Sequence, residues 1–150
     1  MEIKKVRKGD AAIINDILAN HIDSSNKRDE LPTKEHLEKL LEDDRCYLFA
    51  AIIEDTVVGY ALVYRFPSLY ASENLAYLYD IEVSQDHRRK GIGRGLVETL
   101  ISHLKDDDVK ELWLGTGVDN IEGQSLFSAT GAIKTEETFN DYTYYLTDNK

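Results

Sequence analysis

Apolar residues recur along this chain with two different periods, which together predict alternating strands and helices. Runs rich in β-branched and aromatic residues predict strands at Glu2–Val6, Tyr47–Ile53, Val57–Phe66, Leu75–Val83, Val109–Gly115, Ala132–Thr135 and Tyr142–Leu146. Apolar residues three and four apart predict helices after Asp10, after Thr33, after Gly91 and over Asn120–Thr130. This mixture of strands and helices predicts an α/β sandwich around one sheet.

Turn and cap residues mark where these elements begin and end. Asp10 and Thr33 precede the first two helices, as N-cap residues do, and Gly131 follows the last one in a place where a left-handed cap favours glycine. Glu54–Thr56 predicts the turn of an antiparallel hairpin. The polar segment Asp23–Glu30 predicts a loop between the first two helices.

Length and charge bound the kind of protein. Residues 1–150 are enough for one domain with a real core. The formal net charge of −10 disfavours nucleic acid as a partner, because a phosphate-binding surface is basic. The charge favours a cationic partner modestly, although the same charge also serves solubility alone. No apolar run approaches the roughly 20 residues of a membrane helix, and the N-terminus lacks the apolar core of a signal peptide. We expect a cytoplasmic protein with no membrane partner.

Cysteine and histidine usage gives no sign of a metal centre. Cys46 is the single cysteine, so no intramolecular disulfide and no cysteine cluster is expected. The four histidines lack the spacing of metal ligands. We therefore expect no bound metal.

The most informative segment is Tyr77–Gly93, where a strand passes into a glycine-containing turn that opens a helix. A pyrophosphate binds where backbone N–H groups converge at a helix N-terminus, whose dipole favours negative charge. Gly91 and Gly93 leave room for such a ligand. Three cationic residues add positive charge: Arg88, Arg89 and Lys90. An arginine here could equally point at the 3′-phosphate, at solvent or at a carboxylate. The segment favours a phosphate site of the acyl-CoA type.

Glycines also mark ordinary tight turns, so the context of this turn matters. The helix after it carries one apolar face, as a core-packed helix does. The chain has neither the Gly-Lys-Ser/Thr ending of a Walker loop nor the Gly-x-Gly-x-x-Gly of a dinucleotide fold.

The run Arg88-x-x-Gly91-x-Gly93 after an apolar strand resembles the acetyl-CoA signature of the GNAT superfamily of N-acetyltransferases. Over roughly Phe66–Leu100 the sequence also resembles the aminoglycoside 3-N-acetyltransferase branch. The resemblance implies acetyl-CoA as co-substrate and a homodimer. It implies a mixed, mostly antiparallel sheet flanked by about four helices, with the fourth and fifth strands splayed around the pantetheine chain.

The resemblance also implies roles for main-chain groups. The N–H groups near Ile81 and Val83 would polarise the thioester carbonyl. The amides of Arg89–Gly93, including that of Ile92, would hold the pyrophosphate. Asn120 matches a position near the pantetheine, although an asparagine before a helix is also a common cap.

Two acids in an apolar strand call for an explanation. Asp80 and Glu82 are two residues apart, so they project from the same face of the strand. In one interpretation a carboxylate orients the cationic amine and accepts its proton, directly or through water. In the other, each acid pairs with a nearby arginine or lysine. Asp80 is favoured as the catalytic residue because the aminoglycoside-acetylating branch carries an aspartate at the matching place.

One position departs from the family pattern. Many GNAT enzymes place a tyrosine on the last helix to protonate the leaving thiolate, and the matching position here is Phe127. A phenyl ring donates no proton. Ser125, another tyrosine or water could act instead, or the thiolate could leave unassisted, since a thiol pKa near 8.5 makes it a tolerable leaving group.

The sequence therefore predicts an N-acetyltransferase that moves acetyl from acetyl-CoA directly to an amine of a small cationic substrate, with an aminoglycoside as the leading acceptor. A peptide, protein or polyamine acceptor is the nearest enzymatic alternative. An acyl-CoA-binding module with weak catalysis is the alternative of a different class, and Phe127 suggests it.

Overall fold

A five-stranded sheet forms the centre of the protein, and its strands lie side by side in chain order. The computed structural model describes residues 1–22 and 31–147, so the loop predicted at Asp23–Glu30 lies outside the described residues. The strands are β1 (Glu2–Lys5), β2 (Cys46–Ile53), β3 (Thr56–Pro67), β4 (Asn74–Val83) and β5 (Val109–Trp113). β1 to β4 pair antiparallel, whereas β5 runs parallel to β4. The predicted α/β class and the mixed, mostly antiparallel sheet are confirmed.

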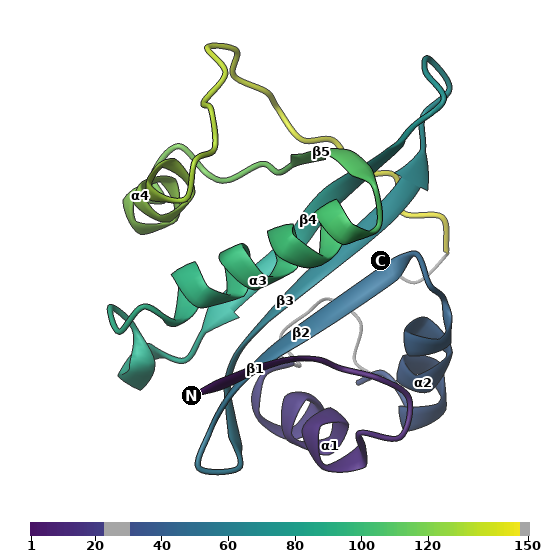
Figure 1. The fold of residues 1–150 in the computed structure, drawn as a ribbon, viewed down its shortest axis with the longest axis vertical. Coiled ribbons are helices and arrows are strands. Elements are labelled where there is room, and N and C mark those ends of the chain that lie inside the picture. The colour runs from purple at the N-terminus through teal and green to yellow at the C-terminus, as the bar shows by residue number, and fades with distance from the viewer. Residues whose placement is uncertain (23–30, 148–150) are drawn as a thin grey trace.

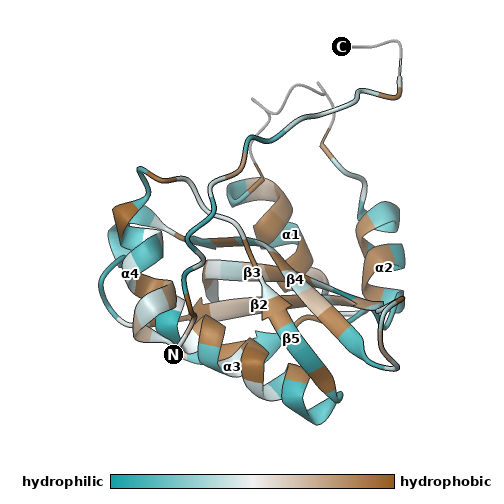
Figure 2. Cartoon of the chain, turned by 90° about the horizontal axis from the view of Figure 1, so that it is seen from above, coloured by the Kyte–Doolittle hydropathy of each residue, from teal (hydrophilic) through white to brown (hydrophobic). Residues whose placement is uncertain are grey.

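Helices cover both faces of the sheet (Figure 1). They are α1 (Ala11–Asn20), α2 (Lys34–Glu42), α3 (Ile92–Asp106) and α4 (Ile121–Ala129). α3 packs on one face over a cluster that includes Phe49, Val63 and Leu100. α1 and α2 pack on the other face, where Ile14 and Leu48 are buried. The apolar side of α3 faces the sheet in Figure 2, as its sequence period predicts.

A bulge in β4 decides which way its acids point. Leu62 of β3 lies opposite Asp80, whereas the next residue, Val63, lies opposite Leu78. Tyr79 is therefore an extra residue in β4, and the alternation of side chains reverses there. Leu78 is buried on the α3 face, so Asp80 falls on the α1–α2 face. Without the bulge, the same acid would point into the core beneath α3.

The fourth and fifth strands separate after a short paired stretch, as the predicted splay requires. β5 pairs with β4 only from Asn74 opposite Val109 to Tyr77 opposite Trp113. The second half of β4, residues 78–83, has no β5 partner. Its main-chain groups on that side therefore form no bonds to β5, which leaves them available to a ligand except for the Val83 carbonyl, which accepts from Arg88.

The prediction of two final strands is wrong. Among the described residues, Ala132–Thr135 and Tyr142–Leu146 form no strand, and the segment from 132 to 147 is exposed. This segment leaves α4 and crosses past β5 to the α1–α2 side (Figures 1 and 2). An alternating sequence fits a half-buried pleated surface, but a strand also needs a partner's backbone. Here no side chain of the segment is buried, so the alternation gains nothing from pairing.

The predicted caps give mixed results. Thr33 caps α2, because its hydroxyl accepts a bond from the His36 amide at 3.1 Å. Gly131 follows α4 in the left-handed region, at φ 101°. Asp10 precedes α1 without a side-chain cap bond, because its carboxylate instead accepts from the Arg7 amide and from Lys4.

Candidate active site

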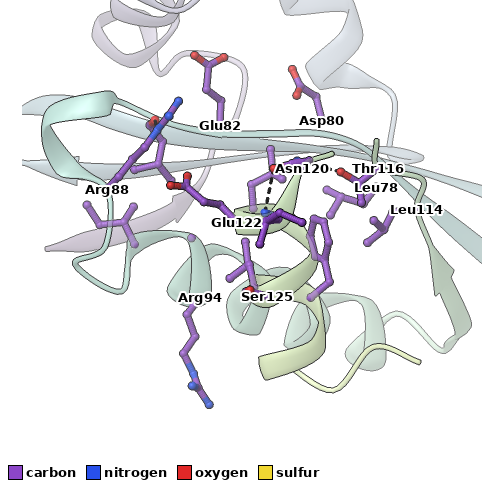
Figure 3. A pocket seen from close by; sticks show the side chains of 18 of the residues that line it. Leu78, Asp80, Glu82, Arg88, Arg94, Leu114, Thr116, Asn120, Glu122 and Ser125 are labelled. Atoms are coloured by element: carbon purple, nitrogen blue, oxygen red, sulfur yellow. Dashed lines mark hydrogen bonds between the residues drawn. The ribbon is translucent and has the colours of Figure 1, made fainter. Parts of the chain in front are cut away.

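A cleft of about 790 Å³ opens where β4 and β5 separate. Its walls are the second half of β4, the turn before α3, the segment after β5 and the first turns of α4 (Figure 3). Of the residues predicted for the site, the structure brings all except Lys90 to this cleft: Asp80, Ile81, Glu82, Val83, Arg88, Arg89, Gly91, Ile92, Gly93 and Asn120. A volume of this size is within the range of ligand sites in proteins.

The turn before α3 has the geometry of an anion site. Arg89 and Gly91 have left-handed backbones, at φ 61° and 81°. No described residue accepts a hydrogen bond from the amides of Gly91, Ile92 or Gly93. Unpaired amides at a helix N-terminus, together with the helix dipole, favour a phosphate group.

The two glycines of the turn serve different purposes. A Cβ at Gly91 would meet no atom within 4 Å, so space is open there, and glycine suits its positive φ. A Cβ at Gly93 would lie 3.2 Å from Leu126 of α4 and 3.8 Å from Val83. Gly93 therefore allows close packing between the start of α3 and α4, in addition to any approach of ligand.

The three cations of the turn are engaged differently. Arg88 Nε donates to the Val83 carbonyl at 3.1 Å. Arg89 forms an exposed ion pair with Glu122 of α4, at 3.3 Å, which stabilises the fold little, so a phosphate could replace Glu122 at small cost. Among the described residues, no side chain pairs with Lys90, which does not line the cleft.

The main chain of β4 presents Ile81 and Val83 to the gap. The Ser84 amide donates to Val58 of β3 at 2.8 Å, so Ser84 points toward β3. Because successive strand residues direct their main-chain groups to opposite edges, those of Val83 and Ile81 point away from β3. The bond from Arg88 to the Val83 carbonyl agrees with this direction.

Asp80 and Glu82 share one hydroxyl donor. Tyr60 lies opposite Glu82 on β3, and its O–H donates to Asp80 Oδ2 at 2.8 Å and lies 3.5 Å from Glu82 Oε2. Within the described residues neither acid forms an ion pair with lysine or arginine. Both side chains point to the side of β4 away from α4 (Figure 3).

Sequence reasoning missed Tyr60. Only 6% of this residue is exposed, and its ring meets His21 edge-on at 6.0 Å. Burial, with donation to Asp80, raises the pKa of the Tyr60 phenol far above its ordinary value, so it remains a donor at all physiological pH. The predicted hairpin held no signal for this contact, because its register pairs Tyr60 with Ala50, and only the pairing of β3 with β4 brings Tyr60 to the acids.

The α4 wall carries Asn120, Ser125 and Phe127. Asn120 caps α4, because its Oδ1 accepts from the Gly123 amide at 3.0 Å while its Nδ2 donates to Thr116. It lines the cleft as well, so both interpretations of Asn120 remain compatible with the structure. Phe127 is half-buried and Ser125 is exposed, and both line the cleft.

Comparison with known proteins identifies the fold family. The model of the acetyltransferase (GNAT) family matches residues 14–132. The chain belongs to the GNAT family. Within the described residues, no cluster of His, Cys, Asp and Glu has the geometry of a metal site. Nor does any described helix combine the length and apolarity of a membrane span.

Solved GNAT structures resemble the whole chain. An aminoglycoside acetyltransferase, meta-AAC0020 from an uncultured soil metagenomic sample, superposes with a TM-score of 0.81 in its complex with sisomicin, at 25% identity over 97% of this chain and 96% of that one. A ribosomal-protein-alanine N-acetyltransferase from Brucella melitensis shares the fold, with a TM-score of 0.72 at 20% identity over 95% of this chain and 100% of that one.

Relatives by sequence include two other acetyltransferases. Human N-acetyltransferase 8 is 32% identical over 102 residues, which are 67% of this chain and 44% of the human protein. The ribosomal protein bS18-alanine N-acetyltransferase of Escherichia coli K12 is 35% identical over 75 residues, which are 50% of this chain and 49% of that protein. The matches span less than half the length of these relatives.

Proposed function

We propose that this GNAT protein transfers acetyl from acetyl-CoA directly to an amine of a small cationic acceptor. The observation that carries the proposal is the pair Asp80 and Glu82, which share one face of β4 and the Tyr60 hydroxyl in the part of β4 that has separated from β5. The phosphate-type turn lies at the same cleft, beyond the end of β4.

Residues on the α3 and α4 side of β4 bind the donor. Acetyl-CoA supplies an activated acyl thioester. The free amides of Gly91, Ile92 and Gly93 bind its pyrophosphate, with Arg89 and the turn's other cations adding charge. The main-chain groups of Ile81 and Val83 line the gap, where an N–H polarises the carbonyl oxygen on which negative charge develops.

Residues on the other side of β4 bind the acceptor. An ammonium group must lose its proton before nitrogen can attack a carbonyl carbon. Asp80 is exposed, and Tyr60 binds its Oδ2, which leaves Oδ1 for the ammonium or for a bridging water. Glu82 adds a second negative charge within reach of the same hydroxyl, so the pair favours a cation.

The last step returns a proton to the leaving thiolate. Phe127 has no hydroxyl, whereas Ser125 on the same helix lines the cleft and has one. Ser125, another tyrosine or a water molecule therefore protonates the thiolate, or the thiolate leaves unassisted.

The acceptor we propose is an aminoglycoside, a small polycation. The acid pair and the net charge of −10 support a cationic acceptor, and so does the similarity to an acetyltransferase solved with sisomicin. Such an acceptor would make the protein an antibiotic-resistance enzyme. A peptide N-terminus is the nearest alternative acceptor, supported by the similarity to the bS18-alanine N-acetyltransferase, and a polyamine would meet the same acids.

A thiol-release assay tests the proposal. Purified protein is given acetyl-CoA together with an aminoglycoside, a polyamine or an alanine-initiated peptide. We expect thiol release that depends on the amine and is fastest with the aminoglycoside. The Phe127 position favours one rival, a module that binds acyl-CoA with weak catalysis. Acetyl-CoA binding by calorimetry, without release from any amine, would support that rival and refute the transferase.

Asp80→Asn tests the assignment of the acid. The amide keeps the shape of the side chain but accepts no proton, so transfer should fall by roughly 10²–10⁴-fold while acetyl-CoA still binds. Asp55→Asn, in the exposed hairpin turn between β2 and β3, is the matched control and should leave transfer unchanged. An unchanged rate for Asp80→Asn at saturating amine would exclude Asp80 as the base.

A further inference from the structure

Five aromatic side chains form a connected cluster on the sheet, outside the parts of the cleft described above. Tyr64 meets Tyr79 edge-on at 5.7 Å, and Tyr79 meets Tyr77 at 6.4 Å. Tyr77 lies 4.4 Å from Trp113, which in turn meets Phe66 at 6.4 Å. We call these five residues the aromatic surface: Tyr64, Phe66, Tyr77, Tyr79 and Trp113.

The strand register places this surface on the same face as the acid pair. Tyr64 lies opposite Tyr77, and Tyr77 opposite Trp113, so their side chains share a face. On β3, Tyr64 is two residues beyond Leu62, which lies opposite Asp80. At about 3.3 Å per residue, Tyr64 lies roughly 7 Å along β3 from the residue opposite Asp80. Tyr79 directly precedes Asp80 in β4, so the aromatic surface borders the acid and continues along the strands.

The aromatic surface is accessible rather than part of the core, with Tyr79 and Trp113 exposed and the other three rings half-buried. The exposed fractions are 65% for Tyr79 and 49% for Trp113, although large aromatic side chains usually lie mostly buried. On this face α1 packs on β3 and α2 on β2, and neither helix makes an extensive contact with β4 or β5. Of the five rings, Tyr79 also lines the cleft. Clustered, accessible rings beside a cleft are typical of a binding surface, because they offer contact area at little cost in side-chain entropy.

We propose that the aromatic surface is the second half of the acceptor site, and that it binds the ring body of a cationic amine whose reacting nitrogen lies at Asp80. The proposal rests on the proposed function, since the amine must reach the acid pair. This acceptor site has the negative charge of Asp80 at one end and the neutral faces of the aromatic side chains beside it. Such a site complements a substrate with a charged head and a flat body. A saturated or aromatic ring makes a large contact area with the aromatic side chains. A linear polyamine makes a smaller contact area and loses more rotational freedom on binding.

Trp113 makes the surface directly observable, because it is the only tryptophan of the chain. The experiment compares kanamycin as the ring-bearing probe with spermidine as the linear probe. Affinity is measured by calorimetry, Trp113 emission is followed during each titration, and acetyl transfer is measured with both amines. The variant is Tyr79→Ala, with Tyr79→Phe as the conservative rescue. Tyr70→Ala, whose side chain is 93% exposed in the β3–β4 loop, is the matched control.

We expect kanamycin to change Trp113 emission in a saturable way. Tyr79→Ala should raise the Kd and the KM of kanamycin about tenfold, the scale of a lost aromatic contact, with kcat little changed. Tyr79→Phe and Tyr70→Ala should stay within about twofold of the wild type. The Kd of spermidine should also change by less than about twofold in every variant.

The outcomes separate this inference from the proposed function. If Tyr79→Ala leaves acetyl transfer to kanamycin unchanged, or weakens the binding of spermidine as much as that of kanamycin, the proposed role of the aromatic surface is overturned and the proposed transferase activity stands. Ring-selective binding that depends on Tyr79, without transfer to any amine, would refute the transferase and keep the surface. Selective transfer to the alanine-initiated peptide, with no response of Trp113 to kanamycin, would overturn the ring-bearing acceptor.

Discussion

Tyr60→Phe is the sharpest test of how the fold builds the acid pair. The substitution keeps the buried ring and its edge-on contact with His21, and removes only the oxygen that lies 2.8 Å from Asp80 and 3.5 Å from Glu82. No unpaired donor is left behind in the core. The change therefore isolates the hydroxyl from the packing of the ring.

The expected size follows from the surroundings of that hydrogen bond. A bond to a charged group contributes about 1.5–3 kcal/mol, but water replaces part of it because Asp80 is exposed. We expect the free energy of unfolding to fall by about 1 kcal/mol, which lowers Tm by roughly 2–4 °C in a protein of this size. If the hydroxyl also orients the carboxylates in the transition state, the loss of about 1 kcal/mol of transition-state stabilisation lowers kcat roughly fivefold.

The assays are thermal unfolding, acetyl-CoA calorimetry and amine-dependent thiol release at saturating acetyl-CoA. Tyr142→Phe, which removes a hydroxyl from an exposed tyrosine, is the control and should match the wild type. An unchanged kcat together with the lower Tm would show that Tyr60 supports only the fold. A parallel loss of acetyl-CoA binding would refute the view that the hydroxyl acts on the acceptor side alone.

Three further predictions concern other parts of the molecule. Gly93→Val should push Leu126 and α4 outward, weaken the binding of acetyl-CoA about tenfold by calorimetry and lower the free energy of unfolding by about 1–3 kcal/mol. Gly91→Ala should cost only the strain of its positive φ, about 1 kcal/mol. Equal binding of acetyl-CoA by both variants would contradict the packing role of Gly93. Phe127→Tyr should raise kcat about tenfold in stopped assays if thiolate protonation limits the reaction, with unchanged acetyl-CoA affinity, and no gain would mean that another step limits turnover. Burial and donation to Asp107 raise the pKa of Tyr47 to about 12, so its neutral form stabilises the folded state fully below pH 10 and loses that effect between pH 10 and 12. Tyr47→Phe should therefore lessen the fall in Tm between pH 9 and pH 11, and an unaltered fall would contradict the assignment.

The features of the site that depend on neighbouring residues could be predicted from the sequence. Arg88-x-x-Gly91-x-Gly93 predicted a turn at a helix N-terminus, and the turn has left-handed residues and free amides because those properties depend on neighbours in sequence. The shared face of Asp80 and Glu82 was equally predictable, since residues two apart in a regular stretch of strand point to the same face.

Other features depended on partners that are distant in sequence. The final strands were predicted from alternation alone and are absent from the described residues, because pairing needs a neighbouring backbone. The sequence also left open whether an arginine of the turn meets a phosphate, solvent or a carboxylate, and the fold pairs Arg89 with Glu122, 33 residues away in the chain.

The sequence by itself determined the order of the elements, the turn that offers amides to a phosphate, and the family. Only the tertiary structure decided which face receives the acids, because the extra residue at Tyr79 reverses the alternation of β4. It also brought Tyr60 to those acids and joined the rings of β3, β4 and β5 into one surface. Strand register makes these contacts, and a single residue of register moves a side chain from the core to the opposite face of the sheet.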